Sequence, residues 1–476
     1  MAPLSLRDLK RKDLLRSNGY INAKWVDAES GETFTIHDPA TLEPLATVPE
    51  MGRVETAKAV EAAHEAFKSF KKTSARERAR MLRKWSDLSL ENVDDLALIL
   101  TLENGKTLAE AKGEVIYAAS FLEWFAGEAE RTYGEVVPVA KLDHRILTFK
   151  QPVGVAACLA PWNFPIAMIT RKVGAALAAG CTTVCKPAGE TPLSCLAQAV
   201  LAQEAGFAPG TFNVITTLNK VTEVGVELCA NPLVKKLSFT GSTNVGKLLA
   251  KQCAPSLKKL SLELGGNSPF IVFDDADVDK AVEACILAKF RNSGQTCVTA
   301  NRIMVQKGIY HDFVQVLAER VKGLKVGPGT EDGVFIGPLT HERAVDKAIK
   351  HIEDAKRHGA EVVLGANMSK QMLTTREETF APVVGLYQFE TEEEVIATAN
   401  DCEVGLGAFI MTESIARSWR VTEALEVGMV GVNLGLLSAC ESPFGGVKHS
   451  GYGREGGRQG IEEYLVVKSM LINISP

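Results

Sequence analysis

The 476-residue sequence lacks both a metal-binding cysteine pattern and an excess of positive charge. Its ten cysteines form no Cys-x-x-Cys pair, and no Cys/His cluster has the spacing of a zinc site. Lys and Arg number 53 against 58 Asp and Glu, a net charge of −5, so no basic surplus is available to neutralise a phosphate backbone. We therefore expect no metal and no nucleic acid partner.

The sequence also contains no clean membrane span. Its most apolar stretch, residues 153–169, is interrupted by Pro161 and Pro165. The basic N-terminus, residues 1–12, suggests either a transit peptide or a solvated first helix, and its acidic residues and low serine content favour the helix. Several cysteines lie in apolar, Ala-rich surroundings, which is typical of reduced intracellular thiols. A cytoplasmic protein without a membrane partner is expected.

The order of predicted elements indicates an α/β protein with two parallel-sheet units. Apolar residues recur every three to four positions over residues 53–131, which predicts helices, and residues 132–150 predict a projecting hairpin with strands at 136–137 and 145–149. From residue 152 strands and helices alternate, so ligands are expected at the carboxyl ends of parallel strands. The expected strands cover 153–158, 182–185, 211–215, 236–239, 270–273, 302–305 and 361–364. The expected helices cover 169–179, 193–205, 221–228, 244–253, 278–290, 310–322, 344–358, 392–400 and 414–421.

Two glycine-containing turns follow predicted strands. In the turn over residues 239–246, Gly241 and Gly246 allow close backbone approach, and the next helix offers free amides to a phosphate. A simple strand-to-helix turn explains this pattern equally well. Glu263 precedes a Gly-Gly turn at the end of an apolar strand, where it is either a functional carboxylate or an ordinary strand-end acid.

Two further residues are suited to nucleophilic chemistry. Asn163 stands between two prolines that restrict the backbone, so its amide could be aimed at an oxyanion, although turn formation alone would account for it. Cys297 lies on a loop flanked by Gly and polar residues, where a thiolate can act as a nucleophile. For any single cysteine of ten, a buried packing role is the simpler interpretation.

Taken together and in their order, the motifs resemble the aldehyde dehydrogenase superfamily from about residue 20 to the end. The matching segments are 161–165, 186–188, 241–246, 263–266, 294–297, 380–382 and 443–446. Within the superfamily the chain is most similar to the succinate-semialdehyde dehydrogenases, through residues 168–177, 289–297 and 441–448. The resemblance implies a Rossmann-type NAD(P)-binding domain (1–131 and 151–262), an α/β catalytic domain (263–445) and oligomerisation or bridging segments (132–150 and 446–476). A homodimer or homotetramer is expected.

The resemblance implies a role for each matching side chain. Cys297 would attack an aldehyde to give a thiohemiacetal and then a thioester, Asn163 would hold the oxyanion, and Glu263 would activate the hydrolytic water. NADP or NAD would be bound by Trp162, Lys186, Gly241, Ser242, Gly246, Glu378 and Phe380. The far carboxylate of the substrate would be bound by Arg171, Arg291 and Ser438, although either arginine alone could simply pair with a structural acid. The implied substrate is a short carboxylated aldehyde, with succinate semialdehyde the best candidate.

One departure from the family pattern concerns the cofactor. Gly189 stands where a glutamate usually follows the lysine by three residues, and Glu190 is displaced by one. A carboxylate at that position would bind the ribose hydroxyls of NAD and repel the 2′-phosphate of NADP. We therefore expect NADP to be used at least comparably with NAD, unless Glu190 takes over the missing role.

The remaining departures concern the substrate. Ala381, Leu434 and Thr299 differ from the common pattern near the substrate end or the nucleophile, which leaves open a dehydrogenase for a more apolar aldehyde in a biosynthetic pathway. Because a cysteine is absent at Thr299, no disulfide is expected within the nucleophile loop. An inactive structural or binding member of the fold would be expected to lose Cys297, Glu263 or Asn163, all of which are present.

Overall fold

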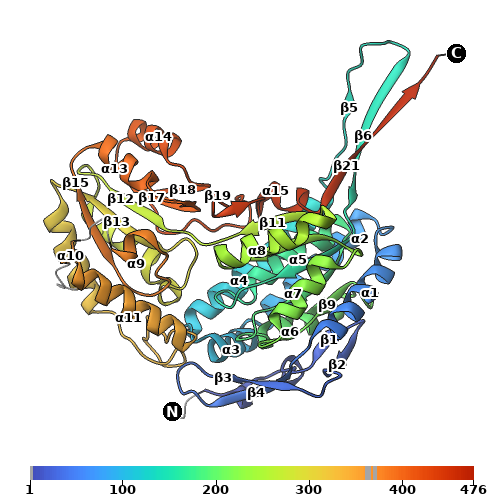
Figure 1. The fold of residues 1–476 in the computed structure, drawn as a ribbon, viewed down its shortest axis with the longest axis horizontal. Helices are drawn as coiled ribbons and strands as arrows, with labels where there is room; N and C mark the ends of the chain where they lie inside the picture. The colour runs from blue at the N-terminus through green and yellow to red at the C-terminus, as the bar shows by residue number, and fades with distance from the viewer. Residues whose placement is uncertain (1–3, 360–365, 368–371, 476) are drawn as a thin grey trace.

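The computed structural model describes residues 4–359, 366–367 and 372–475. It contains two mainly parallel sheets with helices packed against them, and a three-stranded arm that projects from the body (Figure 1). The α/β fold class predicted from the alternating strands and helices is confirmed.

The larger sheet has the strand order β2-β1-β9-β8-β7-β10-β11-β20. Its five central neighbours from β9 to β11 are parallel, and the edge strands are antiparallel. The strands are β1 (Gly19–Ile21), β2 (Lys24–Val26), β7 (Val155–Leu159), β8 (Thr182–Lys186), β9 (Phe212–Val214), β10 (Val234–Thr240), β11 (Lys259–Glu263) and β20 (Gly451–Tyr452).

The second sheet, β14-β15-β13-β12-β17-β18, is parallel throughout. Its strands are β12 (Ser268–Val272), β13 (Ala300–Gln306), β14 (Ala366–Asn367), β15 (Gly385–Phe389), β17 (Gly407–Met411) and β18 (Met429–Val432). The strand expected over 361–364 lies outside the described residues. Two small antiparallel pairs complete the body, β3 (Thr33–His37) with β4 (Pro44–Pro49) and β16 (Val404–Gly405) with β19 (Val447–Lys448).

Helices account for most of the remaining chain. They are α1 (Arg53–Phe70), α2 (Ala75–Glu91), α3 (Val93–Asn104), α4 (Leu108–Ala129), α5 (Ala167–Ala179), α6 (Leu193–Ala205), α7 (Val221–Ala230), α8 (Thr243–Cys253), α9 (Val278–Phe290), α10 (Tyr310–Lys322), α11 (Glu342–Arg357), α12 (Leu373–Arg376), α13 (Glu392–Asn400), α14 (Ile415–Ala424) and α15 (Gly457–Glu462). Across the described residues none of them combines the length and apolarity that a bilayer span requires. The helical pattern predicted over 53–131 forms α1 to α4, and its breaks include Asn92 and Gly105, whose φ of 94° ends α3.

The N-terminus differs from its prediction. Instead of a solvated first helix, the chain forms two three-residue 3-10 turns, Leu6–Asp8 and Lys12–Leu14. Leu9 and Leu14 are buried, and the backbone N–H groups of the two residues after Leu9 both donate to Asp95 of α3. These contacts hold the segment against the body, where a continuous helix could not bury both leucines and also make the two hydrogen bonds.

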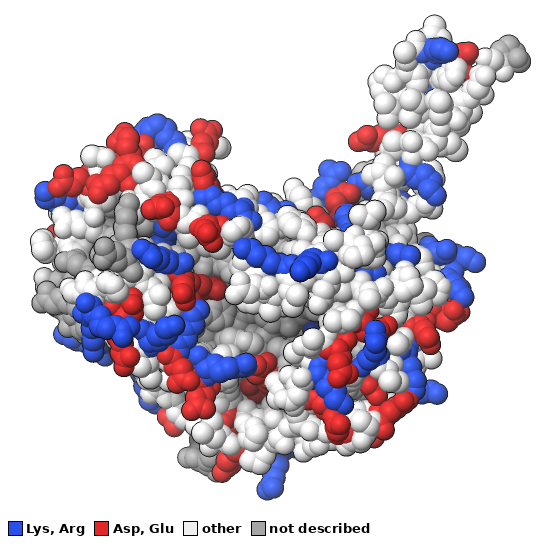
Figure 2. All heavy atoms as spheres, in the orientation of Figure 1, with Lys and Arg blue, Asp and Glu red and all other residues white. Residues whose placement is uncertain are grey.

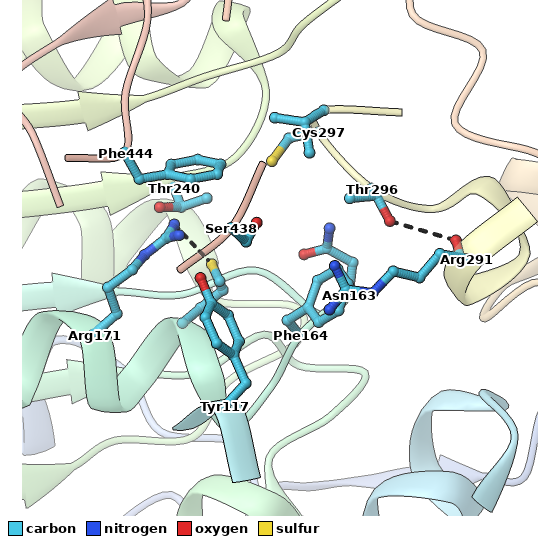
Figure 3. Close-up of a pocket in the computed structure, with 12 residues that line it drawn as sticks. Tyr117, Asn163, Phe164, Arg171, Thr240, Arg291, Thr296, Cys297, Ser438 and Phe444 are labelled. Carbon is cyan, nitrogen blue, oxygen red and sulfur yellow. Dashed lines mark hydrogen bonds between the residues drawn. The ribbon is translucent and has the colours of Figure 1, made fainter. Parts of the chain in front are cut away.

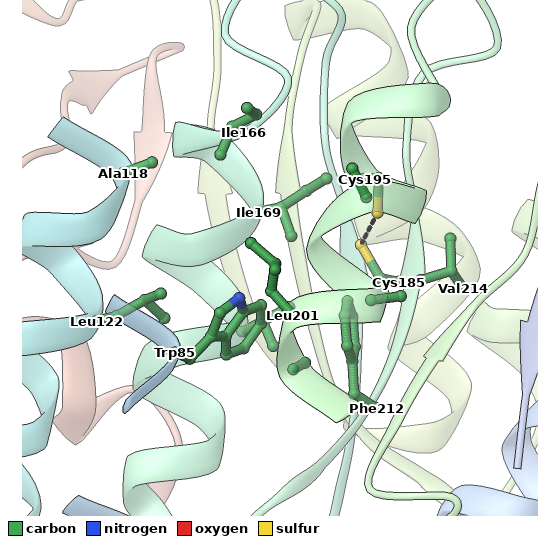
Figure 4. Packing of buried hydrophobic residues seen from close by; sticks show 14 of the residues in the cluster. Trp85, Ala118, Leu122, Ile166, Ile169, Cys185, Cys195, Leu201, Phe212 and Val214 are labelled. Atoms are coloured by element: carbon green, nitrogen blue, oxygen red, sulfur yellow. Dashed lines mark hydrogen bonds between the residues drawn. The ribbon is translucent and has the colours of Figure 1, made fainter. Parts of the chain in front are cut away.

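The core beneath the larger sheet forms a rigid support for the functional residues. All thirteen residues of α5 are buried, and α5 packs against α4, which in turn packs against α2. Trp85 and Phe212 lie in the same cluster (Figure 4), and the Trp85 indole donates to Gln198 at 2.7 Å. Because protein interiors are closely packed, a helix buried on every side holds its side chains in well-defined positions.

The projecting arm joins two distant parts of the chain. Strand β21 (Leu465–Asn473) pairs with β6 (His144–Pro152) over nine residues, and β6 pairs with β5 (Val136–Val137). The strands predicted at 136–137 and 145–149 are confirmed, whereas β21 was not predicted. Val467 and Leu471 are exposed on β21, and the visible face of the arm carries few charged side chains (Figure 2).

Candidate active site

Functional candidates gather at the carboxyl edge of the larger sheet. β8 ends at Lys186 and β11 at Glu263, while Asn163 follows the end of β7. Thr240 at the end of β10 lies opposite Glu263 in the sheet register. Parallel strands end at the same edge, so residues separated by up to a hundred positions come together there, as the sequence predicted.

A pocket at this edge connects the larger sheet with the loop before β13 (Figure 3). It is lined by Tyr117, Asn163, Phe164, Met168, Arg171, Thr240, Arg291, Thr296, Cys297, Val298, Ser438 and Phe444. Five of these were predicted as site residues, namely the nucleophile, the oxyanion amide and the three candidate carboxylate ligands. Glu263 does not line the pocket directly but lies behind it, next to Arg171.

The loop that carries Cys297 has an unusual backbone. Asn292, Ser293 and Gly294 have φ values of 50°, 55° and 74°, three consecutive residues in the left-handed region. A Cβ on Gly294 would lie 2.5 Å from the carbonyl oxygen of Ala381, so only glycine fits there. The Thr299 hydroxyl donates to the Gly294 carbonyl at 3.1 Å. Such strain persists only where surrounding contacts maintain it, and it is common at functional sites.

The Asn163 loop is tied to the same region by buried polar groups. The Asn163 side chain donates to the Gln295 carbonyl at 2.9 Å, and Lys106 donates to the Asn163 carbonyl at 2.8 Å. Lys106 also pairs with Glu114, which accepts the Ile166 N–H at 2.9 Å. An amide NH₂ has two N–H groups, so one remains free to reach into the pocket. This geometry suits stabilisation of an oxyanion.

Cys297 and Glu263 influence each other's protonation. Burial and then the Glu263 carboxylate raise the pKa of the Cys297 thiol well above its usual value. Burial also raises the pKa of Glu263, and the charge of Arg171 opposes that rise. Neither carboxylate oxygen of Glu263 has a hydrogen-bond partner among the described residues. A carboxylate with a raised pKa and free lone pairs is suited to act as a general base.

Arg171 is held by a buried acid that the sequence did not reveal. Its Nε donates to Glu455 at 2.6 Å, and its Nη2 lies 3.7 Å from Glu263. Lys172 pairs with the same Glu455. Although burial opposes ionisation, the Lys172 and Arg171 charges lower the pKa of Glu455 to about 2. Arg171 therefore pairs with a structural acid and also lines the pocket, the guanidinium lying over the Phe444 ring at 4.4 Å.

Arg291 has different surroundings at the other side of the pocket. Its guanidinium lies 5.0 Å from the Phe164 ring centroid and makes no salt bridge with a described acid. Ser438 also lines the pocket. The structure thus brings all three predicted carboxylate ligands together, but only Arg291 offers a positive charge that no protein acid neutralises.

The residues predicted to hold a nucleotide lie at or after the ends of β7, β8 and β10 at the same edge, except Glu378 and Phe380, which precede β15. The Trp162 ring meets Phe380 edge-on at 5.4 Å, and Lys186 donates to the Pro187 carbonyl at 2.9 Å. Ser242 caps α8 through its hydroxyl, which accepts the Val245 N–H. A Cβ on Gly246 would lie 2.4 Å from Leu264, and one on Gly241 would lie 2.5 Å from the Phe239 ring. Glu378 accepts the Gly266 N–H at 3.4 Å.

The structure explains the glycine at position 189. A Cβ there would lie 2.8 Å from both the Leu218 Cα and the Thr217 carbonyl oxygen, which are backbone atoms. Glu190 does not replace the missing carboxylate in this conformation, because it forms a salt bridge of 2.8 Å with Arg343. The packing of the loop over residues 217–218 therefore excludes a side chain at 189.

The other sequence departures do not enter the pocket. Ala381 is fully buried against the Gly294 turn, and Leu434 is 43% exposed and packs near Gly431. Neither lines the pocket. In the described part of the chain, no group of three or more His, Cys, Asp or Glu side chains is arranged to hold a metal ion.

Sequence reasoning missed several pocket residues, among them Tyr117, Phe164 and Phe444, and the buried acid Glu455. The aromatic residues resemble ordinary core residues in the sequence, and Glu455 is separated from Arg171 by 284 positions. A signal was available for α4, where Glu110, Glu114 and Tyr117 lie at helical spacing on one side of the helix.

Comparisons with known proteins agree with this geometry. The aldehyde dehydrogenase family model matches residues 25–470. The chain is 52% identical to the NADP(+) succinate-semialdehyde dehydrogenase 1 of Schizosaccharomyces pombe, covering 98% of each chain, and 51% identical to the glutarate-semialdehyde dehydrogenase of Pseudomonas putida, covering 98% of this chain and 100% of that protein. The crystal structure of succinate-semialdehyde dehydrogenase from Burkholderia pseudomallei is similar with a TM-score of 0.96 at 51% identity, covering 98% and 100% of the two chains. The chain belongs to the aldehyde dehydrogenase family.

Proposed function

We propose that the protein oxidises a short carboxylated aldehyde, with succinate semialdehyde the best candidate, to the corresponding dicarboxylic acid with NADP or NAD. The observation that carries the proposal is the pocket itself. It brings together a cysteine on a strained loop and an arginine, Arg291, that has no acidic partner among the described residues. The full-length similarity to enzymes named for succinate and glutarate semialdehydes supports the same substrate class.

The residues around Cys297 supply the covalent chemistry. The Cys297 thiol gives its proton to the neighbouring Glu263 carboxylate, which passes it on to solvent, and the thiolate bonds to the aldehyde carbon. The free N–H of Asn163 and the backbone N–H of Cys297 stabilise the oxygen that becomes negative. A bound nicotinamide supplies the hydride acceptor that this oxidation needs. Glu263 then takes a proton from water, whose oxygen attacks the thioester carbon and releases the acid and the Cys297 thiol.

The charge balance of the pocket favours a substrate with one negative charge. With Glu263 ionised, the buried group of Arg171, Lys172, Glu455 and Glu263 has a formal charge of zero. Arg291 then provides the only positive charge of the described pocket lining that no such acid offsets. A planar guanidinium suits a carboxylate because it can make paired, charge-assisted hydrogen bonds.

The carboxyl edge of the larger sheet fits a dinucleotide. The turn after β10 brings the N-terminus of α8 close to β11, since Gly246 packs against Leu264 without room for a Cβ. A helix N-terminus with free amides suits a pyrophosphate. We assign Ser242, Gly241 and Gly246 to that group, Lys186 to the adenosine ribose, Glu378 to the nicotinamide ribose, and Trp162 and Phe380 to the space beside the nicotinamide. Residues 1–131 and 151–262 would form the cofactor domain and 263–445 the catalytic domain.

The closed position at Gly189 supports NADP as a cofactor. No carboxylate stands there to repel a 2′-phosphate, and Lys186 lies nearby. We expect kcat/KM with NADP to be at least comparable with that for NAD in steady-state assays. A hundredfold advantage for NAD, about 2.7 kcal/mol, would contradict this assignment.

The projecting arm supports a homo-oligomer. Its exposed apolar residues, such as Val467 and Leu471, and the free edges of a three-stranded sheet are suited to cover another copy, as a homodimer or homotetramer. The ten free cysteines favour a reducing compartment such as the cytoplasm.

The substrate proposal is tested by comparing succinate semialdehyde with butanal, which has the same carbon number without the carboxylate. The wild type should have a kcat/KM for succinate semialdehyde that is roughly thirty- to a thousandfold higher than for butanal, since a charged pairing is worth about 2–4 kcal/mol. Cys297→Ala should abolish turnover of both aldehydes while cofactor still binds. A wild type that prefers butanal would refute the proposed substrate class.

A further inference from the structure

Tyr117 faces the pocket but has no part in the chemistry proposed above. It lies on α4, on the same side as Glu110 and Glu114, since residues four and seven positions apart share a helix face. Glu110 accepts the Asn292 N–H at 2.6 Å, and Glu114 accepts the Ile166 N–H at 2.9 Å. These two acids tie the nucleophile loop and the oxyanion loop to α4, so Tyr117 keeps a defined position relative to both.

The Tyr117 hydroxyl is a buried donor that the protein leaves unpaired. Its oxygen is buried and has no hydrogen bond of normal geometry to a described residue. Figure 3 shows it pointing toward Arg171 and Ser438, both of which lie near enough to influence the pKa of the hydroxyl. A buried hydroxyl without a partner is unfavourable, so this position favours a ligand atom that accepts its hydrogen.

The surroundings favour an anionic acceptor over an uncharged one. Burial raises the pKa of Tyr117, so the hydroxyl stays protonated and remains a donor at neutral pH. Arg171, Arg291 and Ser438 line the same pocket and add further donors. The Tyr117 ring packs edge-on against Phe121 with 4.7 Å between centroids, which restricts its rotation away from the pocket.

We propose that Tyr117 donates a hydrogen bond to the far carboxylate of the substrate and is thereby a specificity-determining residue of this enzyme. The inference rests on the proposed function, because it requires a carboxylated aldehyde. It adds a neutral donor to the arginines and explains how a pocket with one unbalanced positive charge orients a two-oxygen group. Arg291 attracts the anion, and Tyr117 with Ser438 selects its orientation.

The test is Tyr117→Phe, which removes only the hydroxyl and leaves the ring packed on Phe121. We expect kcat/KM for succinate semialdehyde to fall ten- to a hundredfold, mainly through a higher KM, because hydrogen bonds to charged groups are the stronger ones. The value for butanal should stay within about twofold, since butanal has no acceptor at that end. Tyr133→Phe, at a position that is 67% exposed, is the matched control and should leave kcat/KM unchanged for both substrates.

The outcomes separate this inference from the proposed function. If Tyr117→Phe lowers kcat/KM equally for both substrates, Tyr117 acts through packing and the inference is wrong. If the substitution changes kcat/KM for neither substrate, the hydroxyl does not contact the carboxylate, and the inference is wrong as well. Failure of the proposed function appears instead in the wild type, as a preference for butanal before any substitution is made, and the inference then fails with it.

Discussion

Arg171 and Arg291 reach the same pocket from two sides, but their surroundings differ. Arg171 is 1% exposed, comes from a fully buried helix and pairs with Glu455. Arg291 is half-buried, stands at the start of the strained nucleophile loop and lies over an aromatic ring without an acidic partner among the described residues. The same residue type therefore serves two purposes. One guanidinium belongs to the framework, and the other leaves its charge available to a ligand.

The largest expected effect is a loss of folding stability when the buried Arg171–Glu455 pair is removed. Arg171→Met leaves Glu455 buried with Lys172 as its remaining cation and withdraws the charge that favours ionised Glu263. Removing one member of a buried pair typically costs about 3–5 kcal/mol. The apparent Tm should fall by several degrees at a fixed scan rate, with Arg171→Lys as the matched control that keeps the charge. An unchanged Tm would mean that the pair contributes little to the fold.

Arg291→Ala should affect catalysis and leave folding stability nearly unchanged. Because no described acid depends on Arg291, we expect its Tm to remain close to that of the wild type. We expect kcat/KM for succinate semialdehyde to fall by about 2–4 kcal/mol, roughly thirty- to a thousandfold, with little change for butanal. Steady-state rates on both aldehydes check this. Equal losses on the two substrates would show that Arg291 supports the nucleophile loop instead.

The smallest expected effect concerns the thiol. Arg171 lowers the pKa of Cys297, whereas burial and Glu263 raise it above its usual value, so the thiolate fraction of the free enzyme should still be rising with pH near 9. Arg171→Met should raise that pKa further and slow alkylation of Cys297 by iodoacetamide at a given pH, while Arg291→Ala should leave the rate unchanged. Glu263→Gln should shift the curve to lower pH, because it removes a carboxylate charge that raises the pKa of the Cys297 thiol.

Peptide mapping by mass spectrometry identifies the labelled cysteine in that experiment, with Cys297→Ser as the control for labelling elsewhere. An alkylation rate that levels off below neutral pH would contradict the raised pKa. Equal rates for the two arginine variants would contradict the difference between them.

Local patterns were sufficient for much of the secondary structure. The helices predicted over 193–205, 278–290, 310–322 and 392–400 have the observed boundaries. Each follows from apolar periodicity and end signals that lie within the segment itself. The strand β21 was missed because its pairing with β6 joins residues more than three hundred positions apart. The N-terminal helix was predicted wrongly because its leucines pack into the core and its backbone amides donate to Asp95 of α3, which local periodicity does not reveal.

By itself, the sequence determined the family resemblance and the nature of the reactive groups: a cysteine on a glycine-flanked loop, an asparagine between prolines, a strand-end glutamate and two arginines. Each is recognisable because its chemistry depends on residue type and near neighbours. Only the tertiary structure decided which arginine keeps a free charge, since Glu455 reaches Arg171 through packing across 284 positions. It likewise placed Tyr117 at the pocket and closed position 189 against the backbone of Leu218. Charge balance and available space depend on residues that are neighbours in the folded protein. Because these neighbours are far apart in the sequence, local sequence patterns do not reveal them.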